Sequence, residues 1–447
     1  MFTEIRLSLR DSVVKIHSGI VKNKVYVWSN NLIKVLLFLF VATLPIYLKI
    51  SNIFLGLAVV LFFITLPFTL PVYREHITPN WKKLFSSTLV LYLFVLISLI
   101  YSYDTSETMR FVEYRAAFAF FPLIFFLGFK LSRKEFELIL SGLVPGVFVI
   151  LLYYWGLGIY SIHDGLITWD QMSVDTLEEF DVPFKTHRTY LSFYALFSLV
   201  IVLFSKNVKY KTWFKIFMSL LIFVSIFFYE SRVIVGIVMA FAIAYPFMVS
   251  RGKRLVKTAV IIYSVLLAAI MFMVAMKGHD RLLERFSKVP DEIDVSFVDG
   301  EFGYDSRASR WALAWDFIKE KPLTGYGAGC EKEVLYDSYV DNGMRWSANA
   351  ELDIHNQYLS LWFDNGIFAV LFYVYMLVFM FIKSLRRGDV IMCSFVFICA
   401  VMSMFENILN VNWMITLFAF VSTAIIFDQK EDGGLFCRNG SGTATSS

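Results

Sequence analysis

Long apolar runs separated by short polar breaks occupy most of this chain. A helix that crosses the roughly 30 Å hydrocarbon layer of a membrane needs about 20 mostly apolar residues, which is close to the length of many of these runs. We therefore predict an all-α membrane protein with about twelve transmembrane helices. The predicted spans cover residues 33–49, 53–72, 86–103, 114–129, 138–160, 188–205, 212–229, 232–249, 258–276, 366–382, 389–405 and 413–428.

Polar segments divide the chain into five predicted parts. The longest polar segment is the loop of residues 277–365 between spans 9 and 10, and loops of that length are usually functional or disordered. The other parts are a cytoplasmic N-terminal segment (1–32), spans 1–9 (33–276), spans 10–12 (366–428) and a tail (429–447). The small, polar residues of the tail predict a disordered cytoplasmic segment.

The positions of the positive charges predict the orientation of the spans, because Lys and Arg collect in cytoplasmic loops. With the N-terminus inside, every even-numbered connection is basic, whereas the connection after the fifth span is rich in Asp and Glu. Both ends are then cytoplasmic, and the 277–365 loop faces the periplasm of a bacterial inner membrane. The basic residues of the inside connections are Arg74, Lys82, Lys83, Lys130, Arg133, Lys134, Lys206, Lys209, Lys211, Arg251, Lys253, Arg254, Lys383, Arg386 and Arg387.

Composition supports a membrane protein and argues against nucleic-acid binding. Of the 447 residues, 58% are hydrophobic and 17% are charged, whereas soluble domains average about 25% charged residues. The formal net charge of +4 is too small to indicate a nucleic-acid partner. The expected environment of the chain is the lipid bilayer.

The 277–365 loop has helical patterning, so we do not expect disorder in it. Arg307, Trp311 and Ile318 recur at helical spacing, and tryptophan suits the membrane interface. Pro322 and the glycine turn of residues 325–329 end this helix. We interpret the turn as a flexible connection, because it follows a helix and lacks the ending of a nucleotide-binding loop. A second helix is predicted to begin near His355 and to run toward the tenth span.

His355 is the leading candidate for chemistry, since imidazole is the usual side chain for moving protons near neutral pH. Two interpretations stay open, a catalytic base and a structural histidine that caps a helix or is hydrogen-bonded. His187 and Arg188, at the outer end of the sixth span, are further candidates of the same kind.

Arginines at the outer face are candidates for anion binding. Arg232 begins the eighth span, where the helix dipole also favours an anion, although arginine at a span end often only anchors the helix at the interface. Arg307, with Arg310 nearby, offers a guanidinium fork that suits phosphate, the alternative being a solvated helix face. Glu406, beside Asn407 at the end of span 11, can orient a cation or His355, or cap a helix.

These motifs together resemble the O-antigen ligase and polymerase superfamily of membrane glycosyltransferases, whose fold is of the GT-C-like type. The resemblance lies in Arg307-Ala-Ser-Arg-Trp311, in Pro322-Leu-Thr-Gly-Tyr-Gly-Ala-Gly329, and in His355-Asn-Gln-Tyr-Leu359 followed by Gly366. It implies that His355 is the base and that Arg307 and Arg232 bind the diphosphate of an undecaprenyl-diphosphate-linked glycan. It also implies a metal-independent inverting transfer with no cofactor. The supporting residues are then Arg310, Trp311, Asn356, Glu406, His187 and Arg188.

The resemblance predicts transfer of a glycan to an acceptor hydroxyl at the periplasmic face, and we expect ligation of O-antigen to lipid A core. A polymerase of repeat units and a protein O-oligosaccharyltransferase stay open as alternatives. Cys330 stands where some relatives have an acidic residue after the glycine turn. A transporter of lipid-linked sugars is a rival from another class, but it needs ionisable residues along the spans, and these spans are nearly free of them. An assembly scaffold is a further rival.

Overall fold

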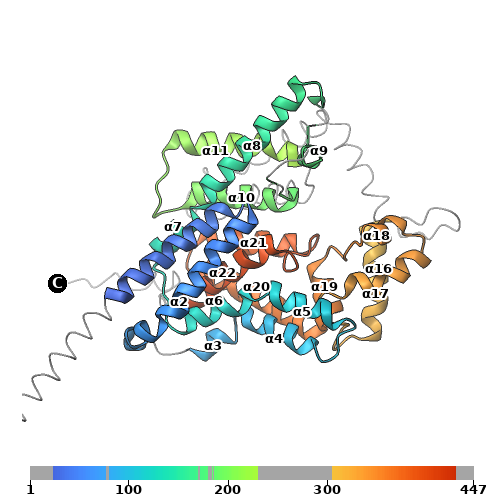
Figure 1. The fold of residues 1–447 in the computed structure, drawn as a ribbon, viewed down its shortest axis with the longest axis horizontal. Helices are drawn as coiled ribbons and strands as arrows, with labels where there is room; N and C mark the ends of the chain where they lie inside the picture. The colour runs from blue at the N-terminus through green and yellow to red at the C-terminus, as the bar shows by residue number, and fades with distance from the viewer. Residues whose placement is uncertain are drawn as a thin grey trace, which may run out of the picture.

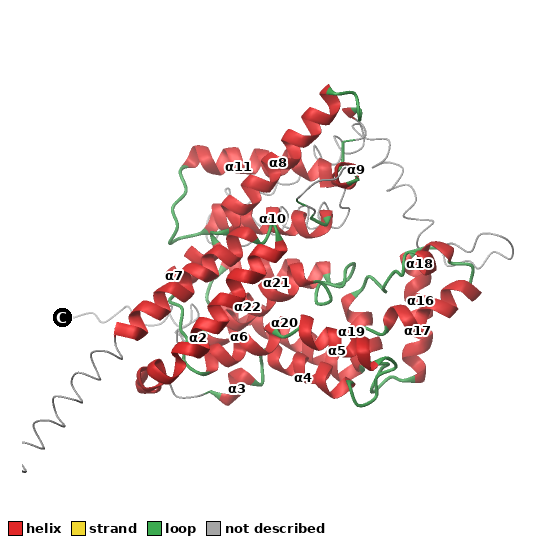
Figure 2. Ribbon diagram, viewed as in Figure 1, coloured by secondary structure: helices red, strands yellow, loops and turns green. Residues whose placement is uncertain are grey.

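The computed structural model describes residues 24–76, 80–169, 172–179, 184, 186–229 and 305–428, and every regular element in these ranges is a helix (Figure 2). The all-α prediction is confirmed for this part of the chain. Predicted spans 8 and 9, the candidate Arg232, the residues before 305 of the predicted periplasmic loop and the C-terminal tail lie outside the described residues.

Ten of the twelve predicted spans coincide with an apolar helix, but the count of twelve is not confirmed. Four helices among the described residues are long and apolar enough to cross a membrane: Lys24–Thr43, Leu48–Pro71 within α2 (Leu48–His76), Arg133–His163, and α20 (Ile367–Arg386). The Arg133–His163 stretch comprises α7 (Arg133–Leu140) and α8 (Leu143–His163). The other apolar helices are shorter, namely α4 (Thr88–Ser98), α6 (Ala117–Phe126), α10 (Arg188–Phe204), α11 (Thr212–Tyr229, apolar over Thr212–Ile222), α21 (Val390–Met402) and α22 (Asn412–Phe427).

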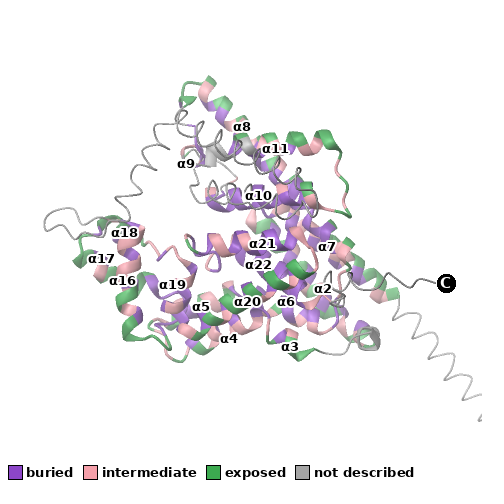
Figure 3. Ribbon diagram, turned by 180° about the vertical axis from the view of Figure 1, so that it is seen from behind, coloured by how far each residue is buried: buried purple, intermediate pink, exposed green. Residues whose placement is uncertain are grey.

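The apolar helices pack into one bundle around α22. Helix α6 and helix α20 both lie against α22, and α10 packs on α8, α11 and α21 (Figure 1). Almost every residue of α22 is buried, as the central ribbons in Figure 3 show. By contrast, α2 exposes Ile53, Leu57, Val60 and Ile64, side chains that suit contact with lipid. The described helices therefore have the surface of a multi-pass membrane protein.

Residues 305–365 form a small helical unit at one end of the bundle (Figure 1). It contains α16 (Arg307–Glu320), α17 (Glu331–Asp341), α18 (Arg345–Asn349) and α19 (Gln357–Asn365). Apolar side chains from this unit make a second core, separate from that of the bundle, which includes Ala314, Leu335, Tyr339 and Phe363. The predicted helix near 306–318 is α16, whereas α17 and α18 were not predicted. The remaining short helices are α3 (Trp81–Leu84), α5 (Thr105–Tyr114) and α9 (Val174–Glu178).

Glycines allow the turn of residues 325–329 and the junction between α19 and α20 to pack closely. The glycine turn lies against the end of α19, where the Gly327 N–H donates to the carbonyl of Asp364 at 2.9 Å. A Cβ on Gly325, whose φ is +72°, would lie 2.3 Å from the carbonyl oxygen of Phe363. Gly366 separates α19 from α20 with φ of +76°, and a Cβ there would lie 1.9 Å from the carbonyl oxygen of Leu323. The helix predicted to begin near His355 and to run toward span 10 is α19, which Gly366 separates from α20. The turn is a closely packed joint.

Candidate active site

The backbone around His355 is held on both sides. The N–H of Ile354 donates to Oε2 of Glu331 at 3.0 Å, and the carbonyl of Ile354 accepts from Nε1 of Trp311 at 2.9 Å. His355 itself has φ of +51°, and its N–H donates to Oδ1 of Asp353 at 3.0 Å. A non-glycine residue with positive φ persists only where its surroundings fix it, and such residues cluster at functional sites. Trp311, one turn after Arg307 on α16, therefore positions the histidine segment.

The imidazole of His355 lies between two carboxylates. Its Nδ1 is 3.2 Å from Oδ1 of Asp353 and 3.4 Å from Oε2 of Glu406, and the side chain is 25% exposed. Two acceptors beside Nδ1 favour a proton on that nitrogen, which leaves the lone pair of Nε2 available in the neutral ring. The ring is therefore arranged to accept a proton at Nε2.

Arg307 contacts the same carboxylate from the other side. Its Nη2 is 3.2 Å from Oε1 of Glu406, and its Nη1 donates to the carbonyl of Phe405 at 3.0 Å. The side chain is 37% exposed, and a guanidinium has five N–H donors. Donors remain for an anion that approaches from the exposed side. Glu406 thus links His355 and Arg307, which are 48 residues apart in sequence.

Glu406 is buried, yet its environment favours the charged form. Burial pushes the pKa of this carboxyl upward, but the hydrogen bond from His355 and the positive charges of Arg307, His355 and His187 outweigh it, so the pKa lies below its ordinary value. Glu406 therefore remains a carboxylate at neutral pH. A permanent negative charge at this position can stabilise a protonated His355.

The 403–411 loop between α21 and α22 carries Glu406, and hydrogen bonds with two buried side chains, Arg115 and Gln357, fix its backbone. The guanidinium of Arg115, which is 2% exposed, donates through Nε to the carbonyl of Leu409 at 3.0 Å and through Nη2 to Oδ1 of Asn410 at 2.5 Å. Oε1 of Gln357 accepts from the N–H of Leu409 at 2.5 Å. These bonds connect the loop to the start of α6 and to α19. The position of Glu406 therefore depends on bundle and helical unit together.

Two buried acids lie beneath the site, and sequence reasoning did not single them out. Glu331 accepts from Ser360, from Ile354 and, at 3.4 Å, from Nδ2 of Asn407, while Asp364 accepts from the N–H of Gly329 at 3.1 Å. Burial, together with the charge of Asp364, raises the pKa of Glu331, and burial raises that of Asp364. Glu331 directly follows Cys330, the position for which the family resemblance implies an acidic residue in some members. An acidic side chain next to the glycine turn is thus present one residue later.

Two predicted supporting residues have structural contacts. Arg310 is buried, and its Nη1 lies 3.3 Å from Oγ of Ser347, which in turn bonds Asp305. Oδ1 of Asn356 accepts from the N–H groups of Tyr358 and Leu359 at 3.1 and 3.2 Å, so Asn356 is the N-cap of α19. Because Asn356 has this role, the helix-cap interpretation of His355 no longer applies.

The start of α10 lies near the site. His187 precedes the first residue of this helix, its side chain is exposed, and its charge contributes to the lowered pKa of Glu406. Arg188 is the first residue of α10 and is partly buried. The third predicted cation, Arg232, is outside the described residues, so the structure brings together His355, Arg307, Trp311, Glu406 and His187 but does not place Arg232.

The fold and this site define a multi-pass helical membrane protein in which a histidine and a partly exposed guanidinium share one buried carboxylate at one end of the bundle. Residues 217–374, about a third of the chain, match the family model of the O-antigen ligase domain. The predicted resemblance to the O-antigen ligase superfamily is confirmed over this segment, which contains Arg232, Arg307 and His355. A comparison with curated proteins finds no match. The segment ends before Glu406, so the bridging carboxylate lies beyond the matched residues.

Proposed function

We propose that this protein transfers a glycan from undecaprenyl diphosphate to an acceptor hydroxyl at the periplasmic face of the bacterial inner membrane. The carrying observation is the bridge formed by Glu406, whose two carboxylate oxygens lie 3.4 Å from Nδ1 of His355 and 3.2 Å from Nη2 of Arg307. The family match supports a glycosyltransferase of the ligase or polymerase type. His355 and Arg307 both lie within the matched segment, and both contact Glu406.

His355 acts as general base in this proposal. The acceptor O–H is bound at Nε2, the acceptor oxygen attacks the anomeric carbon, and Nε2 takes the proton. The anomeric C–O bond to the diphosphate breaks, and the diphosphate leaves with the electron pair. Attack from the side opposite the leaving group inverts the anomeric configuration without a metal. Glu406 and Asp353 stabilise the imidazolium that forms.

Arg307 binds the leaving group. A guanidinium donates two parallel hydrogen bonds to phosphate oxygens, and the exposed side of Arg307 offers donors that Glu406 and Phe405 do not use. Arg232, one of the family-implied cations, is the second proposed diphosphate ligand. Charge on the diphosphate grows as the C–O bond breaks, so these contacts strengthen in the transition state.

The identity of the acceptor distinguishes a ligase from a polymerase or a protein glycosyltransferase. We favour ligation of O-antigen to the lipid A core, and the alternatives are elongation by further repeat units and transfer to protein hydroxyls. All three use the same base and the same leaving group. They differ only in which hydroxyl reaches Nε2.

Reconstitution of the full-length protein tests the proposal. The purified protein is given undecaprenyl-diphosphate glycan with, separately, lipid A core, additional lipid-linked repeats or a hydroxyl-containing peptide. Product mass separates ligase, polymerase and protein glycosyltransferase. Movement of the lipid-linked glycan across vesicles without a new glycosidic bond indicates the rival transporter, and no reaction with any acceptor contradicts the enzyme proposal.

A further inference from the structure

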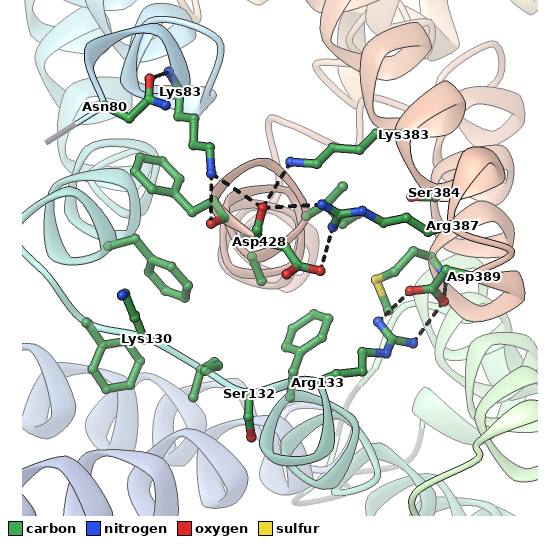
Figure 4. Close-up of a pocket in the computed structure, with 18 of the residues that line it drawn as sticks. Asn80, Lys83, Lys130, Ser132, Arg133, Lys383, Ser384, Arg387, Asp389 and Asp428 are labelled. Atoms are coloured by element: carbon green, nitrogen blue, oxygen red, sulfur yellow. Dashed lines mark hydrogen bonds and ion pairs between the residues drawn. The ribbon is translucent and has the colours of Figure 1, made fainter. Parts of the chain in front are cut away.

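A basic cavity of about 520 Å³ lies at the other end of the bundle (Figure 4). It combines residues from three connections that sequence analysis assigned to the cytoplasmic side, and from the end of α22. Figure 4 shows Lys83, Lys383 and Arg387 directed toward Asp428, with Lys130 and Ser132 across the cavity. The cationic lining residues among those described are Lys83, Lys130, Arg133, Lys383 and Arg387.

Positive charge exceeds negative charge around this cavity. The described acidic lining residues are Asp389 and Asp428, which pair with Arg133 at 2.6 Å and with Arg387 at 2.5 Å. Nζ of Lys383 donates to the carbonyl of Ile426 at 2.8 Å, at the C-terminus of α22. A helix terminus carries only about half of a negative charge. With five cationic and two acidic side chains, the described lining has a positive net charge, which favours an anionic ligand.

The cavity and the candidate active site lie at opposite ends of the same helices. Helix α22 begins beside the 403–411 loop and ends at the cavity, and α20 begins after Gly366 and ends at the cavity. Their 16 and 20 residues correspond to about 24 and 30 Å of helix. This distance is close to the roughly 30 Å hydrocarbon thickness of a bilayer. A ligand in the cavity is therefore distinct from the glycan substrates.

One wall of the cavity is aromatic, as a lipid ligand requires. Phe125, Phe126 and Phe129 line it. Trp81, which is 59% exposed, packs on Phe126 with ring centroids 4.6 Å apart. Exposed tryptophan is typical of the membrane interface. An apolar wall can contact the acyl chains of a lipid, whereas free phosphate has no apolar group to place there. The cations and the rings together match a phosphate group attached to hydrocarbon.

We propose that this cavity binds the phosphate headgroup of an anionic membrane lipid. Lysine ammonium groups bind phosphate as point charges, and basic pockets between helices on the cytoplasmic side are suited to such headgroups. The proposal depends on the cavity alone and stands whether or not the chain transfers glycans.

Lipid binding by the full-length protein in detergent tests this assignment. The protein is titrated with short-chain phosphatidylglycerol, with phosphatidylcholine of equal chain length, and with inorganic phosphate. We expect tighter binding of phosphatidylglycerol than of the other two. Lys130→Gln should weaken that binding about fivefold, and Lys83→Gln with Lys130→Gln about thirtyfold. The single variant leaves the Lys83 contact with the end of α22 intact, so it keeps the test valid if the double variant is unstable.

A matched control is available in the same connections. Lys82 and Lys134 are exposed and do not line the cavity, so their double change to Gln removes the same charge. We expect phosphatidylglycerol affinity in this control to stay within about twofold of the original value. Equal losses in the two double variants, or equal affinity for both phospholipids, would overturn the proposal. If inorganic phosphate binds as tightly as phosphatidylglycerol, the conclusion that the ligand is a lipid would be wrong.

Discussion

The two ends of the bundle both gather cations, but they hold them by different means. At the active-site end, Arg307 and His355 share one buried carboxylate, Glu406, within 3.4 Å. At the cavity end, Arg133 and Arg387 also pair with carboxylates. Lys83 and Lys383, by contrast, approach the main-chain carbonyls that end α22, with Nζ–O distances of 3.3 and 2.8 Å. A carboxylate fixes the geometry and protonation of its partner, whereas carbonyls at a helix end accept any cation that reaches them.

The difference predicts different consequences of substitution. The active-site groups come from α16, the segment before α19 and the 403–411 loop, so each depends on a particular packing of distant elements. The cavity cations lie at helix ends and in connections, and they carry long side chains that adjust their position. We therefore expect changes at the first end to act mainly on the rate of transfer. Changes at the second end should act mainly on stability and lipid binding.

Removal of His355 should have the largest effect. For His355→Ala we expect glycan transfer to fall about 10²- to 10⁴-fold, because general-base catalysis contributes that range. The measurement is single-turnover transfer by the reconstituted protein. His163→Ala is the matched control, since His163 also lies beside an aspartate, at 3.3 Å from Asp164, but its side chain is 86% exposed on α8. Full activity in folded His355→Ala would exclude the proposed base.

Glu406→Gln should have the next largest effect. The amide keeps the size of the side chain but removes the negative charge that faces both His355 and Arg307, so transfer should fall about 10- to 100-fold. Glu107→Gln is the control, because Glu107 forms an ion pair with Arg110 at 2.9 Å on α5. A loss of stability without a loss of rate in the folded fraction would mean that Glu406 only holds the loop.

Sequence patterns predicted the helices well, because a long apolar run is itself the signal of a helix in a membrane or in a buried core. Ten predicted spans overlap apolar helices, with end points that differ by up to nine residues, the largest difference being at the first span, 33–49 against Lys24–Thr43. The count could not be checked for 232–276, and α4, α6 and α21 are shorter than a full crossing. These short helices pack against α22 or α20, and hydropathy alone does not reveal such contacts.

The site was predicted only in part. The spacing of residues along one helix can be read from the sequence, but ion pairs between residues far apart in the chain, such as those of Glu406, cannot. The four-residue step from Arg307 to Trp311 predicted that both share one face of a helix, and in α16 Trp311 contacts Ile354 while Arg307 contacts Phe405. Glu331 and Asp364 were missed because nothing in their local sequence shows burial. The position of Glu331 directly after Cys330 and the glycine turn was the available signal.

The buried acids Glu331 and Asp364 predict a pH dependence of stability at the end of the bundle that holds the candidate active site. The pKa values of Glu331 and Asp364 are raised in the folded protein, so the folded state binds more protons than the unfolded state. Their contribution to stability is complete below the ordinary carboxyl range and is lost as pH rises through the raised values. From about pH 5 to about pH 9 we expect a loss on the order of 1 to 3 kcal/mol.

Thermal unfolding followed by tryptophan fluorescence measures this loss. Glu331→Gln removes one of the two titrating groups, so the fall of melting temperature with pH should be smaller in this variant. Asp316→Asn serves as control, because Asp316 is 65% exposed and pairs only with Lys319 in the next turn of α16. A slope that is unchanged in Glu331→Gln would show that this carboxyl does not titrate differently on folding.

Lys383→Gln tests the cavity end and should have the smallest effect. The last carbonyls of a helix have no partner within the helix, and Lys383 supplies a charged donor to one of them, that of Ile426. Loss of the charge should lower stability by about 1 kcal/mol in detergent without anionic lipid, or a few degrees in melting temperature. Arg386→Gln removes the same charge one turn from the cavity, where the side chain is exposed, and should have no comparable effect. Equal losses in both variants would mean that net charge, and not the contact with α22, stabilises this end, and the contrast with the carboxylate-held site would then no longer hold.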